Sequence, residues 1–189
     1  MDKSKEPFTF KNHGTYDIEP IKGIISSFTD EWFQNTERQA TFKEHKTTLT
    51  YFLAWYPLSW NPGEPYVGTI SNPESKLWPH VLPLIQRLEK LHDGKVGRVI
   101  LPKLEANTAI TKHTDQGGYL SVVRRHHIAV ITDPKVKFIV GQDEKYLEPG
   151  VIWEINNMKM HRVINDSSID RVHLLIDIIP NKAIGNETL

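Results

Sequence analysis

The sequence predicts a mainly β protein with helices near its amino terminus, built as an antiparallel barrel or a two-sheet jelly roll. From Lys95 onward, short runs rich in β-branched residues are separated by turn sequences such as QGG and EPG. Upstream, the apolar residues of segment 74–92 recur every three or four positions, as in an amphipathic helix. We expect the 189 residues to form one domain, with residues 1–94 as a helical and aromatic support region and residues 95–180 as the β-barrel core.

The elements of the first half are predicted from local composition. An irregular lead-in comes first, followed by a helix expected around residues 30–45, for which Thr29 or Asp30 can serve as the cap. Residues 47–55, TTLTYFLAW, predict a strand. Residues 55–73 contain four aromatic residues, four prolines and two glycines, which indicates a loop that is either a lid or a packed strap.

The helix expected over residues 74–92 has one apolar stripe, formed by Leu77, Val81, Leu84, Ile85, Leu88 and Leu91. Pro79 and Pro83 lie within it and are expected to bend or restart it. The β-rich half then predicts strands over residues 96–104, 108–115, 122–132, 135–141, 150–156, 161–165 and 170–179.

The last of these strands alternates strongly in polarity. Val172, Leu174, Ile176 and Ile178 fall on one face, and Arg171, His173, Leu175 and Asp177 fall on the other. If the preceding helix covers the apolar face, the polar face points into the barrel, where a buried arginine requires an anion. The alternative is that the polar residues face water on an outer strand.

Charge and composition exclude several classes of partner. Lys plus Arg equals Asp plus Glu at 23 each, so no net field recruits nucleic acid or an anionic membrane. The absence of cysteine excludes disulfides and thiolate metal sites, and it suits a reducing compartment. The first residues lack the apolar segment of a signal peptide, and no apolar run is long enough to span a membrane. We therefore expect a cytoplasmic protein with a small-molecule or peptide substrate, and nothing in the sequence indicates an oligomeric state.

Several residues that bind metals or anions occur close together in the β-rich half. His113 and Asp115 stand two positions apart on a predicted strand, so both side chains can bind one metal. His161 opens a later strand that can return antiparallel to the first and supply a third ligand. Such a set leaves open positions on an octahedral metal, as in non-haem ferrous oxygenases. Arg171 follows on the next strand and can hold a carboxylate through a two-pronged ion pair.

In this order, the motifs resemble those of the Fe(II)- and 2-oxoglutarate-dependent oxygenases, whose double-stranded β-helix is a jelly-roll, cupin-like barrel. The resemblance rests on HTD at residues 113–115, RRHHIAV at 124–130, HRVIN at 161–165 and RVHLLID at 171–177. More narrowly, the chain is similar to the aspartyl/asparaginyl β-hydroxylase branch, which includes hydroxylases of free proline. The resemblance covers about residues 95–180.

The resemblance implies a role for each residue of the set. His113, Asp115 and His161 would hold Fe(II), while O2 and 2-oxoglutarate would be the co-substrates. Arg171 would pair with the distal carboxylate of 2-oxoglutarate.

A further element of the family contacts the co-substrate near the metal, and Arg125 and His127 match it. Arg124 and His126 have the same spacing one position earlier, and strand alternation lets only one of the two pairs face the site. We expect Arg125 and His127 to do so, because they precede Ala129 in the order typical of the family.

The acidic residue of the set narrows the implied reaction. Members of the animal branch lack an acidic ligand, and related halogenases carry a small residue there, whereas this chain has Asp115. The resemblance thus implies hydroxylation of an unactivated C–H bond in an amino acid or peptidyl residue of Asp, Asn or Pro type, with release of succinate and CO2.

Two other classes of protein remain open from the sequence. One is a non-enzymatic cupin-like barrel that binds a small anionic ligand. The other is a metal-dependent hydrolase that uses the same triad together with a carboxylic base, for which Asp177 and Glu154 are candidates.

The other histidines and polar residues near the motifs have weaker assignments. Three residues before His161 are candidates to orient it, namely Trp153, Asn156 and Asn157; the alternative is that they are a core tryptophan and turn asparagines. Tyr119 is a candidate to contact the substrate, and the alternative is an aromatic residue that packs in a turn. His13, His45, His80 and His92 have no partners at ligand spacing, so we interpret them as surface or internally satisfied histidines.

Overall fold

The computed structural model of the chain describes residues 6–33, 46–57 and 59–185. Its helices are α1 (Glu19–Ile25), the 3-10 helix η2 (Asp30–Phe33), α3 (Trp78–His92), α4 (Gly118–Val122) and the 3-10 helix η4 (Asn181–Ala183). Its strands are β1 (Phe10–Thr15), β2 (Thr48–Trp55), β3 (Thr69–Ile70), β4 (Gly94–Leu104), β5 (Thr108–His113), β6 (Arg124–Ile131), β7 (Val136–Val140), β8 (Asp143–Lys145), β9 (Val151–Ile155), β10 (His161–Asn165) and β11 (Arg171–Pro180). Each strand predicted from the sequence has a counterpart here.

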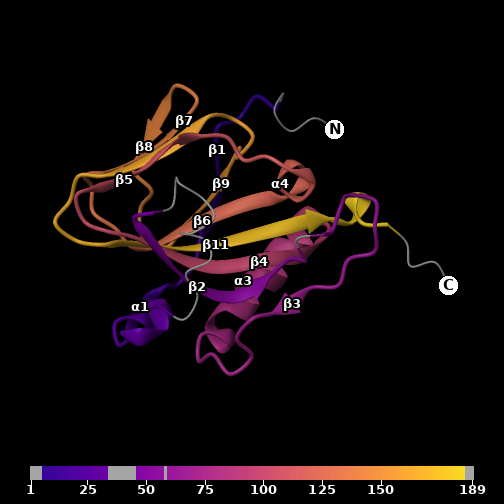
Figure 1. Ribbon diagram of the computed structural model, residues 1–189, viewed down its shortest axis with the longest axis horizontal. Coiled ribbons are helices and arrows are strands. Elements are labelled where there is room, and N and C mark those ends of the chain that lie inside the picture. Colours follow the sequence, from indigo (N-terminus) through magenta and orange to yellow (C-terminus); the bar gives the residue numbers. More distant parts are fainter. Residues whose placement is uncertain (1–5, 34–45, 58, 186–189) are drawn as a thin grey trace.

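The strands form two sheets (Figure 1). The large sheet has the strand order β1-β9-β6-β11-β4-β2-β3, and the small sheet has the order β5-β10-β7-β8. Every pairing between these strands is antiparallel. Figure 1 shows α1 and α3 on one side of the large sheet and the small sheet on its other side. The fold is therefore the predicted double-stranded β-helix, with helices covering one outer face.

The larger hydrophobic core lies between α3 and the large sheet. Val81, Leu84 and Leu88 of α3 belong to one buried cluster with the apolar face of β11, which comprises Val172, Leu174, Ile176 and Ile178. Each such side chain contributes roughly 1.5–3 kcal/mol when fully buried, so the contact fixes the helix on the sheet. The predicted helix-covered face of the last strand is confirmed. Its opposite face does not meet water, because Arg171 and His173 are 1% exposed and Asp177 is 0% exposed.

A smaller core fills the apolar part of the space between the sheets. It is formed by Leu104, Ile110, Val136, Phe138, Val140, Leu147, Ile155 and Val163. Phe138 marks its border with the polar part, since it packs edge-on against the His127 ring, with centroids 5.0 Å apart, and lies 5.8 Å from the Arg171 guanidinium. The barrel interior therefore has an apolar portion and a polar portion.

The amino-terminal region differs from its prediction as an irregular lead-in. It contains β1, which pairs with β9 at the edge of the large sheet, and α1, which has proline in its first turn. The sequence of β1, FKNHGT, contains one large apolar residue and lacks the alternation by which a strand is recognised. Residues 30–33 form η2, and the rest of the helix predicted around residues 30–45 lies outside the described residues.

The helix predicted over residues 74–92 begins later, at Trp78. Pro79 stands in its first turn, where no intrahelical N–H donor is required. Pro83 lies inside the helix, which continues through it without restarting. Within the described ranges, no helix is both long enough and apolar enough to cross a membrane.

The aromatic segment 55–73 is the strap rather than the lid of the two alternatives. Trp60 is 5% exposed and packs edge-on against Tyr66, while Tyr56 stacks on Tyr119 of α4 with ring centroids 3.5 Å apart. The guanidinium of Arg98 lies over the Trp55 ring at 5.2 Å. The aromatic side chains Trp55, Tyr56 and Trp60 are thus packed against Arg98 of β4 and Tyr119 of α4.

Candidate metal centre

Two histidines face each other across the small sheet. His113 ends β5, His161 begins β10, and the two are direct partners in the antiparallel ladder. Their ring centroids lie 4.3 Å apart. The register shifts between this pair and the Ile110–Val163 pair, so that His113 and Ile110 both face the interior although three positions separate them. Such a bulge redirects a side chain, which is why bulges are frequent beside active sites.

Backbone carbonyls orient both rings. His113 Nδ1 lies 2.7 Å from the carbonyl oxygen of Thr111, and His161 Nδ1 lies 2.9 Å from that of Lys159. A carbonyl only accepts hydrogen bonds, so each Nδ1 carries the proton and each Nε2 carries the lone pair. Metal-binding histidines are usually held in this way. Burial lowers the pKa of His161 and so favours the neutral ring that a metal requires.

Asp115 joins the two histidines from a loop, not from a strand. Because β5 ends at His113, the prediction that both residues lie on one strand is wrong for Asp115. The Asp115 N–H instead donates to the backbone oxygen of Asn157 at 3.2 Å, and Asp115 Oδ1 lies 4.0 Å from His113 Nε2. The candidate ligand atoms of Asp115, His113 and His161 all lie within 4.8 Å of one another. Two imidazoles and one carboxylate suit ferrous iron.

An ion-pair network holds the Asp115 carboxylate. Arg125 Nη1 pairs with Asp115 Oδ2, and its Nε and Nη2 donate to the two oxygens of Asp177 at 2.9 and 3.0 Å. Arg98 Nη2 lies 2.9 Å from Asp177 Oδ2. Burial by itself raises the pKa of Asp115, but the Arg125 charge, followed by other nearby charges, lowers it overall. Asp115 is therefore ionised, as a metal ligand must be.

Arg171 lies in the same polar interior and has no carboxylate partner among the described residues. Its Nη2 contacts His173 Nδ1 at 2.6 Å, and its Nε has no hydrogen-bond partner. Burial lowers the pKa of Arg171 to about 9, so the guanidinium is still charged near neutral pH. A buried charge of this kind is unfavourable unless an anion joins it.

His173 supplies a second unsatisfied donor beside Arg171. The arginine nitrogen only donates, so His173 Nδ1 accepts and its Nε2 carries the proton. That Nε2 is buried and finds no hydrogen-bond partner in the described part of the chain. His127 Nδ1 lies 3.4 Å from His173 Nδ1. Burial, and after it the neighbouring His173 and Arg171, lower the pKa of His127, so this ring is neutral beside the Arg171 end of the interior.

The two faces of β6 separate the alternative residue pairs. Arg125 and His127 point into the barrel, toward Asp177 and His173. Arg124 lies 3.3 Å from Glu154 and points the other way. His126 also points away, since its Nε2 contacts His92 of α3, which covers the other face of the sheet. Arg125, however, is engaged by carboxylates of the chain itself, which the sequence did not indicate.

Several residues around the site were missed or differently assigned. Arg98 was missed, and its one indication is a charge within the apolar strand β4. Tyr119 is buried, and its hydroxyl donates to Asp177 at 3.3 Å, so it packs as the strap's partner. The Asn157 backbone oxygen holds Asp115, and Trp153 packs against Phe10 beside the smaller core.

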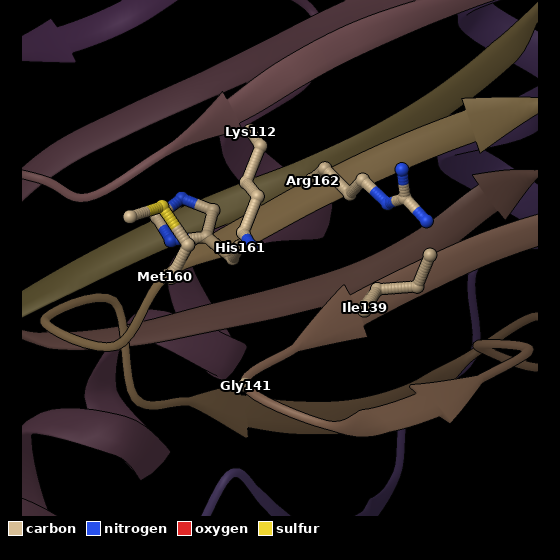
Figure 2. A pocket seen from close by; sticks show the side chains of 6 residues that line it. All are labelled: Lys112, Ile139, Gly141, Met160, His161 and Arg162. Atoms are coloured by element: carbon tan, nitrogen blue, oxygen red, sulfur yellow. The ribbon is translucent and has the colours of Figure 1, made fainter.

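A surface pocket on the small sheet reaches this site only through His161. It is lined by Lys112, Ile139, Gly141, Met160, His161 and Arg162. Figure 2 shows His161 and Met160 at one end of the pocket, with Ile139 and Arg162 at the other. None of the other predicted site residues lines it, so the buried donors around Arg171 are separate from this pocket.

Comparisons with known proteins place the chain in a family. The sequence model described as Aspartyl/Asparaginyl beta-hydroxylase matches residues 25–180. No curated protein matches the sequence. A prolyl-4-hydroxylase from Pseudomonas putida has a similar structure, with a TM-score of 0.57 and 7% identity over 92% of this chain and 94% of that one. A 2OG-Fe(II) oxygenase family oxidoreductase from Burkholderia pseudomallei has a TM-score of 0.52 and 12% identity over 72% and 70% of the two chains.

A third structure is similar over less of its length. AerE from Microcystis aeruginosa is 17% identical with a TM-score of 0.36, and the match covers 43% of this chain and 35% of AerE. The family match, in contrast, covers most of the chain and includes every residue of the candidate site. The protein therefore belongs to the aspartyl/asparaginyl β-hydroxylase family of Fe(II)- and 2-oxoglutarate-dependent oxygenases, and it is an enzyme of that class.

Proposed function

We propose that this enzyme uses Fe(II), 2-oxoglutarate and O2 to hydroxylate an unactivated C–H bond of an amino acid or a peptidyl residue of Asp, Asn or Pro type, releasing succinate and CO2. In this proposal His113, Asp115 and His161 hold the iron. Each histidine binds through Nε2, because its Nδ1 is hydrogen-bonded to a backbone carbonyl. Bound there, the iron and the co-substrate supply the oxidising chemistry, and the chain supplies position and exclusion of water.

The observation that carries the proposal is the unpaired charge of Arg171. The guanidinium is buried, its Nε lacks an acceptor, and the adjacent His173 Nε2 lacks one as well. These donors lie on the interior face of β11, next to the Asp177 carboxylate that Arg125 joins to Asp115. A dicarboxylate that binds the metal at one end and Arg171 at the other satisfies both requirements at once.

Arg125 and His127 keep the roles toward the co-substrate that the resemblance implies, but their contacts refine those roles. Arg125 holds Asp115 Oδ2, so Asp115 offers Oδ1 to the metal. His127 is kept neutral, since burial and the neighbouring His173 lower its pKa, and it can hydrogen-bond a bound carboxylate or keto group without adding charge.

The geometry favours neither rival class. A hydrolase requires a carboxylic base beside the metal, and Asp177 is already engaged by Arg98, Arg125 and Tyr119. Glu154, the other candidate base, pairs with Arg124 and His13 away from the triad. A non-catalytic barrel that binds an anion would use Arg171 but has no need of the oriented metal ligands.

Succinate formation from 2-oxoglutarate tests the function directly. The full chain with Fe(II) is incubated under air with free proline, aspartate or asparagine, and with peptides that contain each residue. The proposal expects one of these to raise succinate above the uncoupled level and to gain one oxygen atom by mass. Succinate at the background level with every substrate, in protein shown to bind Fe(II) and 2-oxoglutarate, contradicts the substrate class.

A cytoplasmic location stays a prediction of the sequence.

A further inference from the structure

A second group of metal-competent side chains lies on the opposite face of the large sheet. His13 of β1, His92 at the end of α3, His126 of β6 and Glu154 of β9 each offer one ligand atom, and these atoms all lie within 4.8 Å of one another. No short spacing in the sequence indicates this group, since its members come from four separate elements. His13 and His92 are internally satisfied, which is one of the two interpretations that the sequence allowed, and their partners come from other elements.

The backbone brings the four side chains to one place for local reasons. His126 and Glu154 are direct partners in the β6–β9 ladder, so their side chains share a face. A register shift between Asn12 and Thr15 in β1 sets His13 beside them. Arg87 of α3 donates from Nη1 to the Thr15 carbonyl at 2.9 Å and so ties this bulge to the helix.

The candidate ligand atoms of the group approach one another closely. His126 Nδ1 donates to the Ile176 carbonyl at 3.2 Å, so its Nε2 carries the lone pair. That Nε2 lies 2.9 Å from His92 Nε2, and His13 Nε2 lies 2.9 Å from Glu154 Oε2. Two ligand atoms bound to one Zn²⁺ at about 2.0–2.1 Å are themselves roughly 3 Å apart.

The surroundings fix the carboxylate of the group. Arg124 lies 3.3 Å from Glu154 Oε1, which leaves Oε2 turned toward His13. A ligating carboxylate held through its other oxygen is typical of protein metal sites.

We propose that His13, His92, His126 and Glu154 form a second metal site, closed by four protein ligands, which takes a borderline divalent cation such as Zn²⁺ and fastens β1 and the end of α3 to the large sheet. Three imidazoles and one carboxylate without a thiolate favour Zn²⁺, Co²⁺ or Ni²⁺ over Mg²⁺ or Ca²⁺. A complete protein ligand set is typical of structural sites, whereas His113, Asp115 and His161 leave positions open.

The protonation states at neutral pH agree with this site. Burial lowers the pKa of His92 to about 4 and that of His126 to about 3, so both rings are neutral. Burial opposes ionisation of Glu154, but the hydrogen bond from His13 and the nearby charges lower its pKa to about 2. Glu154 is therefore ionised as a ligand must be, while His13 Nε2 and His92 Nε2, which donate to Glu154 and His126, must give up their protons when a cation binds.

Zn²⁺ binding by the full chain after chelator treatment and dialysis tests the site. We expect the wild type to bind two equivalents of Zn²⁺ per chain. A triad-disabled variant that carries both His113→Ala and His161→Ala should bind one equivalent. Adding His92→Asn or Glu154→Gln to that variant should weaken the remaining site by ~10-fold or more. His80→Asn is the matched control, because His80 is a partly buried histidine of α3 outside the group.

Two further readouts separate lost binding from lost folding. Co²⁺ in the triad-disabled variant should give the intense visible bands of four-coordination, and His92→Asn should abolish them while the circular dichroism spectrum is unchanged. Zn²⁺ should also raise the unfolding temperature of the triad-disabled variant and of its His80→Asn form, but not that of its His92→Asn form. Absence of Zn²⁺ binding to the triad-disabled variant, or equal affinity in the His92→Asn and His80→Asn forms, overturns the proposal without bearing on the oxygenase function.

Discussion

His113 and His161 are direct cross-strand partners. In each, the Nδ1–H group donates a hydrogen bond to the backbone carbonyl two residues earlier in the chain. The two rings are thus oriented by the strands that carry them, before any metal binds. Asp115 depends on a loop contact with Asn157 instead. The triad therefore combines two rigidly placed ligands with one that is held by hydrogen bonds and by Arg125.

A redox-inactive hard metal should stabilise the protein through this triad. Mn²⁺ at about 100 times its Kd should add about 2.7 kcal/mol to the free energy of unfolding of the wild type, because only the folded chain assembles the site. Asp115→Asn should lose most of this gain, since it removes the anionic ligand. Urea unfolding with and without Mn²⁺ measures the effect. His92→Asn serves as the control and should keep it, so an equal loss in both variants would contradict the assignment of Asp115.

Asp177 should be one of the most sensitive positions for stability. Its carboxylate is fully buried between Arg98 and Arg125, so Asp177→Asn leaves two buried guanidinium groups short of a counter-charge. Breaking such a buried pair costs roughly 3–5 kcal/mol. Glu144→Gln is the control, because its contact with Lys137 is exposed and should cost less than about 1 kcal/mol. Similar unfolding free energies for the two variants would refute this account of the network.

Arg171 should lower the stability of the ligand-free enzyme. Replacing a buried charge that lacks a carboxylate partner by an apolar side chain of similar length is often neutral or stabilising, by about 1–4 kcal/mol. We therefore expect Arg171→Met to unfold at the same urea concentration as wild type or a higher one, and to lose its response to 2-oxoglutarate. Arg162→Met, at an exposed position of β10, should change stability by less than about 0.5 kcal/mol. Strong destabilisation by Arg171→Met alone would mean that Arg171 is a structural residue.

The protein should become less stable as the pH falls below about 6.5, partly through His92. Burial lowers the pKa of His92 in the folded state from 6.5 to about 4, so the unfolded chain binds a proton more readily between these values. This contribution to stability is present above pH 6.5 and is lost as the pH falls toward 4. Unfolding temperatures measured in chelator between pH 7 and pH 4 should fall less steeply in His92→Asn than in His80→Asn. Parallel curves for the two variants would show that His92 titrates normally.

Strand alternation accounts for the parts of the site that the sequence predicted. It placed Arg171, His173 and Asp177 on one face of β11, and it separated Arg125 from Arg124 on β6. These inferences need only the period of two that every strand has.

The features that were missed depend on contacts between distant elements. Asp115 was expected on a strand, because nothing in HTD indicates that β5 ends at His113. The pairing of Arg98 with Asp177, and the meeting of His13 with Glu154, join elements that lie far apart in the chain. Periodicity within one segment cannot reveal such pairs, since they exist only once the sheet order is known.

The most direct test of the central claim is anaerobic absorption spectroscopy of the Fe(II)-loaded protein during titration with 2-oxoglutarate. Chelation of ferrous iron by 2-oxoglutarate gives a weak visible charge-transfer band, which should form in wild type and be absent in His161→Ala. Arg171→Met should form it only at roughly 30-fold or more higher 2-oxoglutarate concentration, as expected when one partner of a buried ion pair is removed. If Fe(II) binds but the wild type forms no band, or if His161→Ala forms it as readily as wild type, the proposed iron and 2-oxoglutarate site is contradicted.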